Sequence, residues 1–118
     1  MSRVRAQYYS ELFDGAKPWS SIGGMLQLTA NTPLSYTVPG NSTQKFRADF
    51  EFNQNDDVWV AYNKTAVIPT PGVAVEVNQQ EFRPTPKFVI GGDVLSFIST
   101  GTNVQCGVSL LQLPNPNQ

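Results

Sequence analysis

The feature that most constrains this sequence is a strict alternation of apolar and charged residues from Lys45 to Phe52. The apolar members are Phe46, Ala48, Phe50 and Phe52, and the charged members are Lys45, Arg47, Asp49 and Glu51. Successive side chains of a strand point to opposite faces, so this period of two predicts a strand with one covered face and one face in water. A polar cluster at residues 53–57 and a β-rich run at 58–62 follow, which together predict a hairpin.

Short β-rich segments recur along the rest of the chain and are separated by turn formers such as Pro39-Gly40-Asn41 and Gly91-Gly92. They occupy residues 25–29, 34–38, 73–77, 81–83, 87–90, 93–99 and 104–113. No amphipathic segment of helical length lies between them, which argues against a βαβ arrangement. We therefore predict an all-β, antiparallel β-sandwich that is jelly-roll-like and has about eight strands.

The length of 118 residues fits one domain, because two cores in so short a chain would each be marginal. We expect an irregular N-terminal arm at residues 1–24, the sandwich at 25–114 and a flexible, Pro/Asn-rich tail at 115–118. The first residues contain arginines but no apolar run, so we expect no secretory signal and synthesis in the cytoplasm. No run approaches the ~18 apolar residues of a membrane span, so we expect no membrane partner.

The charge composition restricts the partners. Lys+Arg number 8, Asp+Glu number 9, and charged residues form 14% of the chain, whereas about 25% is usual. A chain with so few and such balanced charges has no basic field for phosphate backbones, so we expect no nucleic-acid partner. A lightly charged surface suits a protein whose faces are covered by other copies or other proteins.

Enzymatic chemistry has few residues to use. The chain has no histidine and a single cysteine, Cys106, and it lacks the glycine-rich phosphate-binding motifs. We expect Cys106 to be a small buried side chain rather than a nucleophile. We also expect no cofactor, no metal and no catalytic residue.

A pair of carboxylates could still hydrolyse a glycoside. The candidates are Asp49, Glu51, Asp56, Asp57, Glu76, Glu81 and Asp93. Solvated strand and turn positions explain Asp49, Glu51 and the 53–57 cluster better than catalysis does, and that cluster lacks the spacing of an EF-hand calcium loop. A carboxylate glycosidase is kept only as a rival of a different class.

Aromatic residues supply the partner-binding candidates. Tyr8, Tyr9, Phe13 and Trp19 lie in the arm, where their large apolar surfaces need cover from the chain's own sheet or from a neighbour. We expect Trp59 to serve in a core or an interface rather than as a platform for sugars.

Several predicted strands are apolar on both faces. At 93–99 Val94 and Ile98 oppose Leu95 and Phe97, and residues 58–62 and 104–113 behave similarly. An antiparallel sandwich strand normally has one polar face, so the second apolar face needs cover from the arm or from another subunit. We expect a homo-oligomer, with a trimer favoured and the C-terminal strands near the shared surface.

Residues 45–114 resemble small virion proteins of tailed bacteriophages. The similarity lies in FEF (50–52), DVWVAYNKTA (57–66), Pro69, QEFRP (80–84), GGDV (91–94) and VSLLQLP (108–114). The resemblance implies a capsid decoration (cement) protein on the capsid surface of the virion, often trimeric, whose partner is the major capsid protein. The alternative it implies is a head-fibre or tail-associated knob that binds a receptor or glycan. No individual functional residue is carried over.

Overall fold

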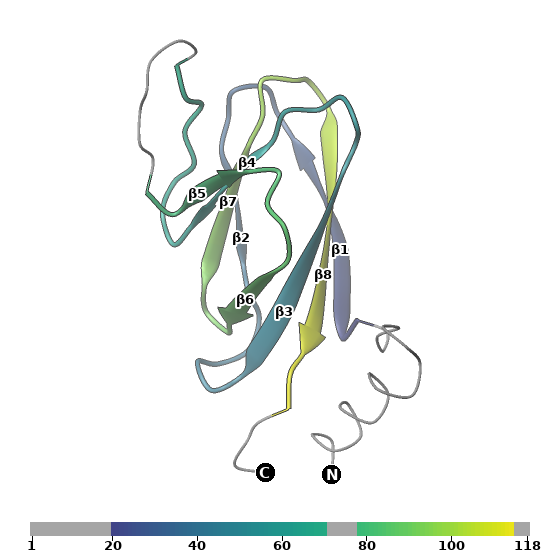
Figure 1. Ribbon diagram of the computed structural model, residues 1–118, viewed down its shortest axis with the longest axis vertical. Coiled ribbons are helices and arrows are strands. Elements are labelled where there is room, and N and C mark those ends of the chain that lie inside the picture. The colour runs from purple at the N-terminus through teal and green to yellow at the C-terminus, as the bar shows by residue number, and fades with distance from the viewer. Residues whose placement is uncertain (1–19, 71–77, 115–118) are drawn as a thin grey trace.

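The computed structural model describes residues 20–70 and 78–114, and within them every regular element is a β-strand (Figure 1). The strands are β1 (Ile22–Leu28), β2 (Leu34–Thr37), β3 (Lys45–Phe52), β4 (Trp59–Tyr62), β5 (Gln80–Phe82), β6 (Lys87–Ile90), β7 (Val94–Ile98) and β8 (Val104–Gln112). The described residues contain no helix that is long and apolar enough to cross a membrane.

The strands form two four-stranded antiparallel sheets with the orders β1-β8-β3-β6 and β2-β7-β4-β5. The first strand pairs with the last, the second with the seventh, the third with the sixth and the fourth with the fifth. This is the strand order of a jelly roll, in which one long folded hairpin is rolled into two facing sheets. The predicted all-β, jelly-roll-like sandwich is therefore confirmed.

Most predicted strands match the observed ones closely. The structure reproduces 45–52 and 87–90, and the other described strands differ by one residue at one or both ends, except at the start of β1. That strand begins at Ile22, so residues 22–24, which we assigned to the arm, belong to the first sheet through their pairing with β8. The strand predicted at 73–77 lies outside the described residues.

The hairpin predicted between residues 45–52 and 58–62 is wrong. β3 pairs with β6 and β8, whereas β4 pairs with β5 and β7 in the opposite sheet. The polar segment between them makes a turn, in which the N–H of Asp56 donates to the carbonyl of Asn53 over 3.2 Å, and then crosses between the sheets. The apolar faces of β3 and β4 both pack on the common core. The two strands therefore face one another across the core instead of lying side by side in one sheet.

The core lies between the sheets and is built from the inward residues of both. Phe97, Leu28, Leu110 and Cys106 are among its fully buried side chains. The burial of Cys106 is as predicted, and desolvation, with a smaller contribution from Asp56, raises the pKa of its thiol to about 11. Phe50 meets Phe97 edge to face across the core, with 6.1 Å between ring centroids.

A second, smaller cluster covers the outer face of β4 and β7. Ala61 and Ile98 point away from the main core and are buried beneath Ala66, with Trp59 and Ile68 packed beside them. The segment at residues 63–70 thus closes the second apolar face of these two strands from within the same chain. For β4 and β7 the cover that we expected from the arm or a neighbour comes from this connecting segment.

Candidate functional site

The sandwich has a cavity at the side where β5 and β6 form the edges of the two sheets. Its volume is about 300 Å³, at the lower end of the range for small-molecule sites. It is lined by Phe50, Val60, Ala61, Tyr62, Gln79, Glu81, Pro84, Lys87, Phe88, Val89 and Leu95. Val60, Val89 and Leu95 are core residues, whereas Glu81 and Phe88 are exposed, so the cavity joins an apolar interior to a polar rim.

An ion pair spans the rim of this cavity. Nζ of Lys87 in β6 donates to Oε2 of Glu81 in β5 over 2.5 Å, so this pair links the two sheets at the side of the cavity. The two side chains are 39% and 55% exposed, and exposed ion pairs contribute little to stability. Both side chains therefore reach the solvent at the rim of the cavity.

Asp93 lies beside this region and holds a structural network. It is buried and accepts hydrogen bonds from the Tyr62 hydroxyl at 2.7 Å, from the Ile90 N–H at 2.9 Å and from the Asn63 amide at 3.2 Å. Burial alone would raise the pKa of Asp93, but these donors outweigh it and hold the pKa below the ordinary value. The hydrogen bond to Asp93, with burial, raises the pKa of Tyr62.

Asp57 performs a similar task at the opposite end of the molecule. Its carboxylate accepts from the Ser99 hydroxyl at 2.9 Å, and from the N–H and hydroxyl of Thr100 at 3.2 and 2.5 Å. Burial acts to raise the pKa of Asp57, and these hydrogen bonds lower it overall. The carboxylate ties the crossing segment before β4 to the turn after β7.

The other predicted site residues have varied outcomes. Tyr8, Tyr9, Phe13 and Trp19 lie outside the described residues, as does Glu76. Within residues 20–70 and 78–114 no three His, Cys, Asp or Glu side chains are grouped as metal ligands would be. Trp59 lies against Phe82, with ring centroids 5.3 Å apart, and packs on the second cluster.

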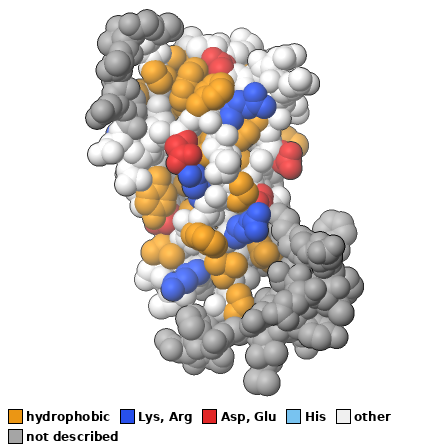
Figure 2. Space-filling model, viewed as in Figure 1, with side chains coloured by type: hydrophobic (Ala, Val, Ile, Leu, Met, Phe, Trp, Pro, Cys, Tyr) orange, Lys and Arg blue, Asp and Glu red, His pale blue; other side chains and the backbone are white. Residues whose placement is uncertain are grey.

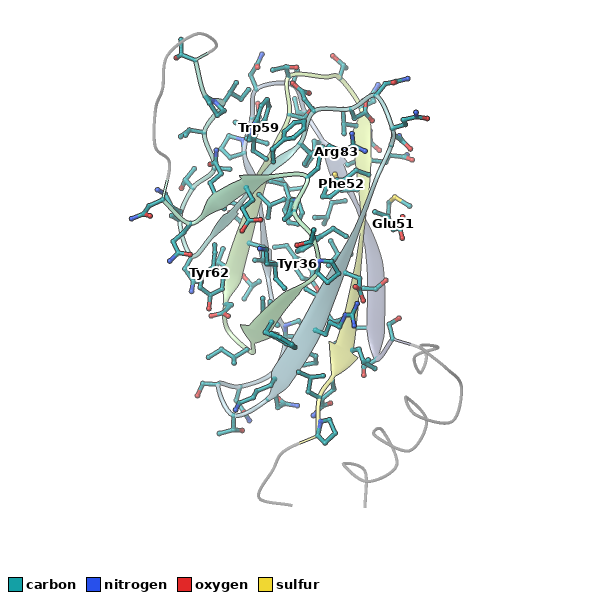
Figure 3. The ribbon with its side chains drawn as sticks, in the orientation of Figure 1. Tyr36, Glu51, Phe52, Trp59, Tyr62 and Arg83 are labelled. Atoms are coloured by element: carbon teal, nitrogen blue, oxygen red, sulfur yellow. The ribbon has the colours of Figure 1, made fainter. Side chains whose placement is uncertain are left out.

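Figure 3 shows where two of the singled-out side chains point: Glu51 projects outward from β3, whereas Trp59 lies over β4 and β5. Sequence reasoning missed the cavity, because its lining comes from strands that are distant along the chain.

Large apolar side chains also reach the surface. The exposed fraction is 78% for Phe88, 66% for Met25 and 53% for Phe82. Figure 2 shows hydrophobic side chains in separate groups on the viewed face, with Lys and Arg side chains between them. Singly exposed apolar side chains are common on soluble proteins, and only a large contiguous patch would by itself mark an interface.

No family model, curated protein or solved structure that was compared with this chain matches it.

Proposed function

We propose that this chain is a virion structural protein of the capsid-decoration type, which binds the major capsid protein and stabilises the head lattice as a homo-oligomer. One observation carries the proposal. The carboxylates of Asp93 and Asp57 each accept several hydrogen bonds and stabilise the fold. The large apolar side chains of Phe88, Met25 and Phe82 are exposed to solvent. These exposed apolar side chains support a role in contacts with other proteins.

Surface burial would supply the binding energy. Each apolar Å² removed from water contributes about 25 cal/mol, less the cost of association, and a symmetric lattice repeats the contact many times. The jelly roll suits this role, because its two sheets are held by antiparallel pairing and a shared core. The resemblance of residues 45–114 to phage virion proteins points the same way.

The proposal is tested by quantitative mass spectrometry of purified particles from the phage that encodes the chain. We expect a copy number comparable with that of the capsid subunits. In a reconstitution with undecorated heads, Phe88→Lys and Phe82→Lys should weaken binding, whereas the exposed polar substitution Gln105→Lys serves as the matched control. Absence from the particle, or a copy number suited only to the tail, would overturn the proposal.

The β5–β6 cavity favours a second candidate, a fibre or tail knob that binds a glycan. Its apolar interior, the exposed Phe88 ring and the Glu81–Lys87 pair together offer stacking and polar contacts to a sugar. A glycan array with the wild-type protein and with Lys87→Ala tests it. Binding that the substitution abolishes would support the knob, and an empty array would count against it.

A further inference from the structure

The free edge of β1 is unlike the other three sheet edges. β2, β5 and β6 contain four, three and four residues. β2 lies between Pro33 and Pro39, β5 contains Glu81, and β6 follows Pro86 and begins at Lys87. Short length, proline and charge are the devices by which proteins stop sheet edges from pairing with other chains.

β1 has none of these protections. It has seven residues, Ile-Gly-Gly-Met-Leu-Gln-Leu, with neither a charge nor a proline. Among the described strands it pairs with β8 alone, so backbone groups along its other edge have no strand beside them. Its central residue, Met25, is 66% exposed. An edge of this kind is a template for a further strand.

The side of the sandwich next to this edge is also apolar. Ile22 and Leu26 of β1, and Leu34 and Tyr36 of β2, pack on the core but are only half-buried. The opposite side, between β5 and β6, instead has the Glu81–Lys87 pair at its rim. A strand added to β1 would therefore gain apolar contacts as well as hydrogen bonds.

We propose that β1 pairs with β1 of a second copy, antiparallel and about a twofold axis at Met25, so that the two β1–β8–β3–β6 sheets become one continuous sheet. This register pairs all seven residues of the strand. It places Ile22 opposite Leu28 of the second copy, and Met25 opposite Met25. Because no residue of β1 is charged, the two paired strands bring no like charges together.

The two glycines of β1 make the strand complementary to itself. Gly24 faces the core side, opposite Val108 of β8, and would lie opposite Leu26 of the second copy. A Cβ built at Gly24 meets no atom within 4 Å, so there is open space for that leucine. On the outer face Gly23 would lie opposite Gln27 of the second copy. Each small residue thus meets a large one, which is why a second copy fits this edge better than an unrelated strand.

The first test is the mass of the full-length protein in solution, by light scattering over a range of concentrations. We expect a dimer, in contrast to the trimer expected from the resemblance. Met25→Lys would place two ammonium groups opposite each other and should weaken the dimer by at least roughly tenfold. Glu51→Lys, at an exposed position of β3 in the same sheet, is the matched control and should leave the dimer intact.

Cysteine cross-linking tests the register. Met25→Cys should give a disulfide-linked dimer under oxidising conditions, because the two thiols lie opposite each other. Gln27→Cys should not, since the twofold axis separates the two copies of that residue by at least roughly 13 Å. The native Cys106 is buried and serves as an internal control.

Several outcomes would overturn the proposal. These are a monomer at all concentrations, a trimer, or cross-linking of Gln27→Cys without cross-linking of Met25→Cys. A monomer that dimerises only after residues 1–19 are removed would show that these residues occupy the free edge of β1 in their own copy. That result would also overturn the proposal. The inference does not depend on the virion proposal, because a dimer can form whether or not the protein binds a capsid.

Discussion

Asp93 joins three parts of the chain through one buried carboxylate. It accepts hydrogen bonds from β4 through Tyr62, from Asn63 just beyond β4, and from the backbone of Ile90 at the end of β6. Asn63 in turn accepts from the N–H of Val94 at 2.7 Å. The β6–β7 turn and the end of β4 are therefore fixed by the ionised form of a single residue.

The lowered pKa of Asp93 makes stability depend on acid. A carboxyl whose pKa is lower in the folded state contributes its full stabilisation above the ordinary value of 3.8 and loses it as the pH falls through the folded-state pKa. Asp93→Asn should lower the free energy of unfolding at pH 7 by about 1–3 kcal/mol and reduce its decline in acid. Urea unfolding at pH 7 and at pH 3 measures both, with the exposed Glu51→Gln as control. An unchanged acid response in Asp93→Asn would contradict the assignment.

Cys106 should be chemically silent while the protein is folded. Its side chain has no exposed surface, and burial raises its pKa to about 11, so little thiolate exists near neutral pH. A thiol reagent such as DTNB should label it at pH 8 only at the rate of unfolding, and at once in denaturant. Rapid labelling of the native protein would show that the core opens locally.

The 63–70 segment acts as a cover for the outer face of β4 and β7. Its backbone is held by side chains: the Ala66 N–H donates to Oγ of Ser96 at 2.9 Å, and the Gln80 amide bonds both the N–H and the carbonyl of Val67, at 2.9 and 2.8 Å. Side chains thus replace a strand partner for this stretch. The arrangement leaves Val67 exposed while Ala66 is buried.

Ile68→Ala should loosen this cover. Ile68 packs beside Trp59 over Ala61 and Ile98, and removing a partly buried isoleucine side chain costs about 2 kcal/mol or less. The emission of Trp59 should shift to the red, which is best measured in a Trp19→Phe background. Val67→Ala, in the same segment but exposed, is the control and should leave the emission unchanged. Equal shifts in both variants would indicate that the segment is not packed on Trp59.

Sequence reasoning predicted the strands well but not their partners. The alternation of apolar and charged residues at 45–52 depends only on local strand geometry. The bounds of β3 were therefore predicted without error. The polar turn after it is compatible with a return in the same sheet or with a crossing to the other, and the core decides between them. The same limit applies to the strands that are apolar on both faces and to the cavity. Ala66 packs over Ile98, and Glu81 pairs with Lys87 across the two sheets, only because of the tertiary structure.

The jelly roll as a whole is held by pairings between distant parts of the chain. β1 pairs with β8, and β2 pairs with β7, so part of the core forms only when segments far apart along the chain have met. Closing such long loops costs entropy before the contacts repay it, which slows folding. The spacing of the strands in the sequence predicted the fold class. The exposed surfaces that a partner would use were found only in the three-dimensional structure.

Refolding should accordingly take milliseconds to seconds, with one cooperative unfolding transition. Stopped-flow fluorescence of Trp59 in the Trp19→Phe background measures the rate. Urea midpoints from fluorescence and circular dichroism should coincide, and separate midpoints would contradict a single cooperative unit.

The adjacency of β1 and β8 also governs how the protein can be extended. The Ser21 N–H donates to the Leu110 carbonyl at 2.7 Å, and the Gln112 N–H donates to the Ser21 hydroxyl at 3.0 Å, so the described chain enters and leaves the sandwich at one pole. A tag or reporter joined directly to Ser20 or to Pro114 would start from that pole. The far pole, with the turns at 29–33, 53–57 and 99–103, would then remain free of the cargo.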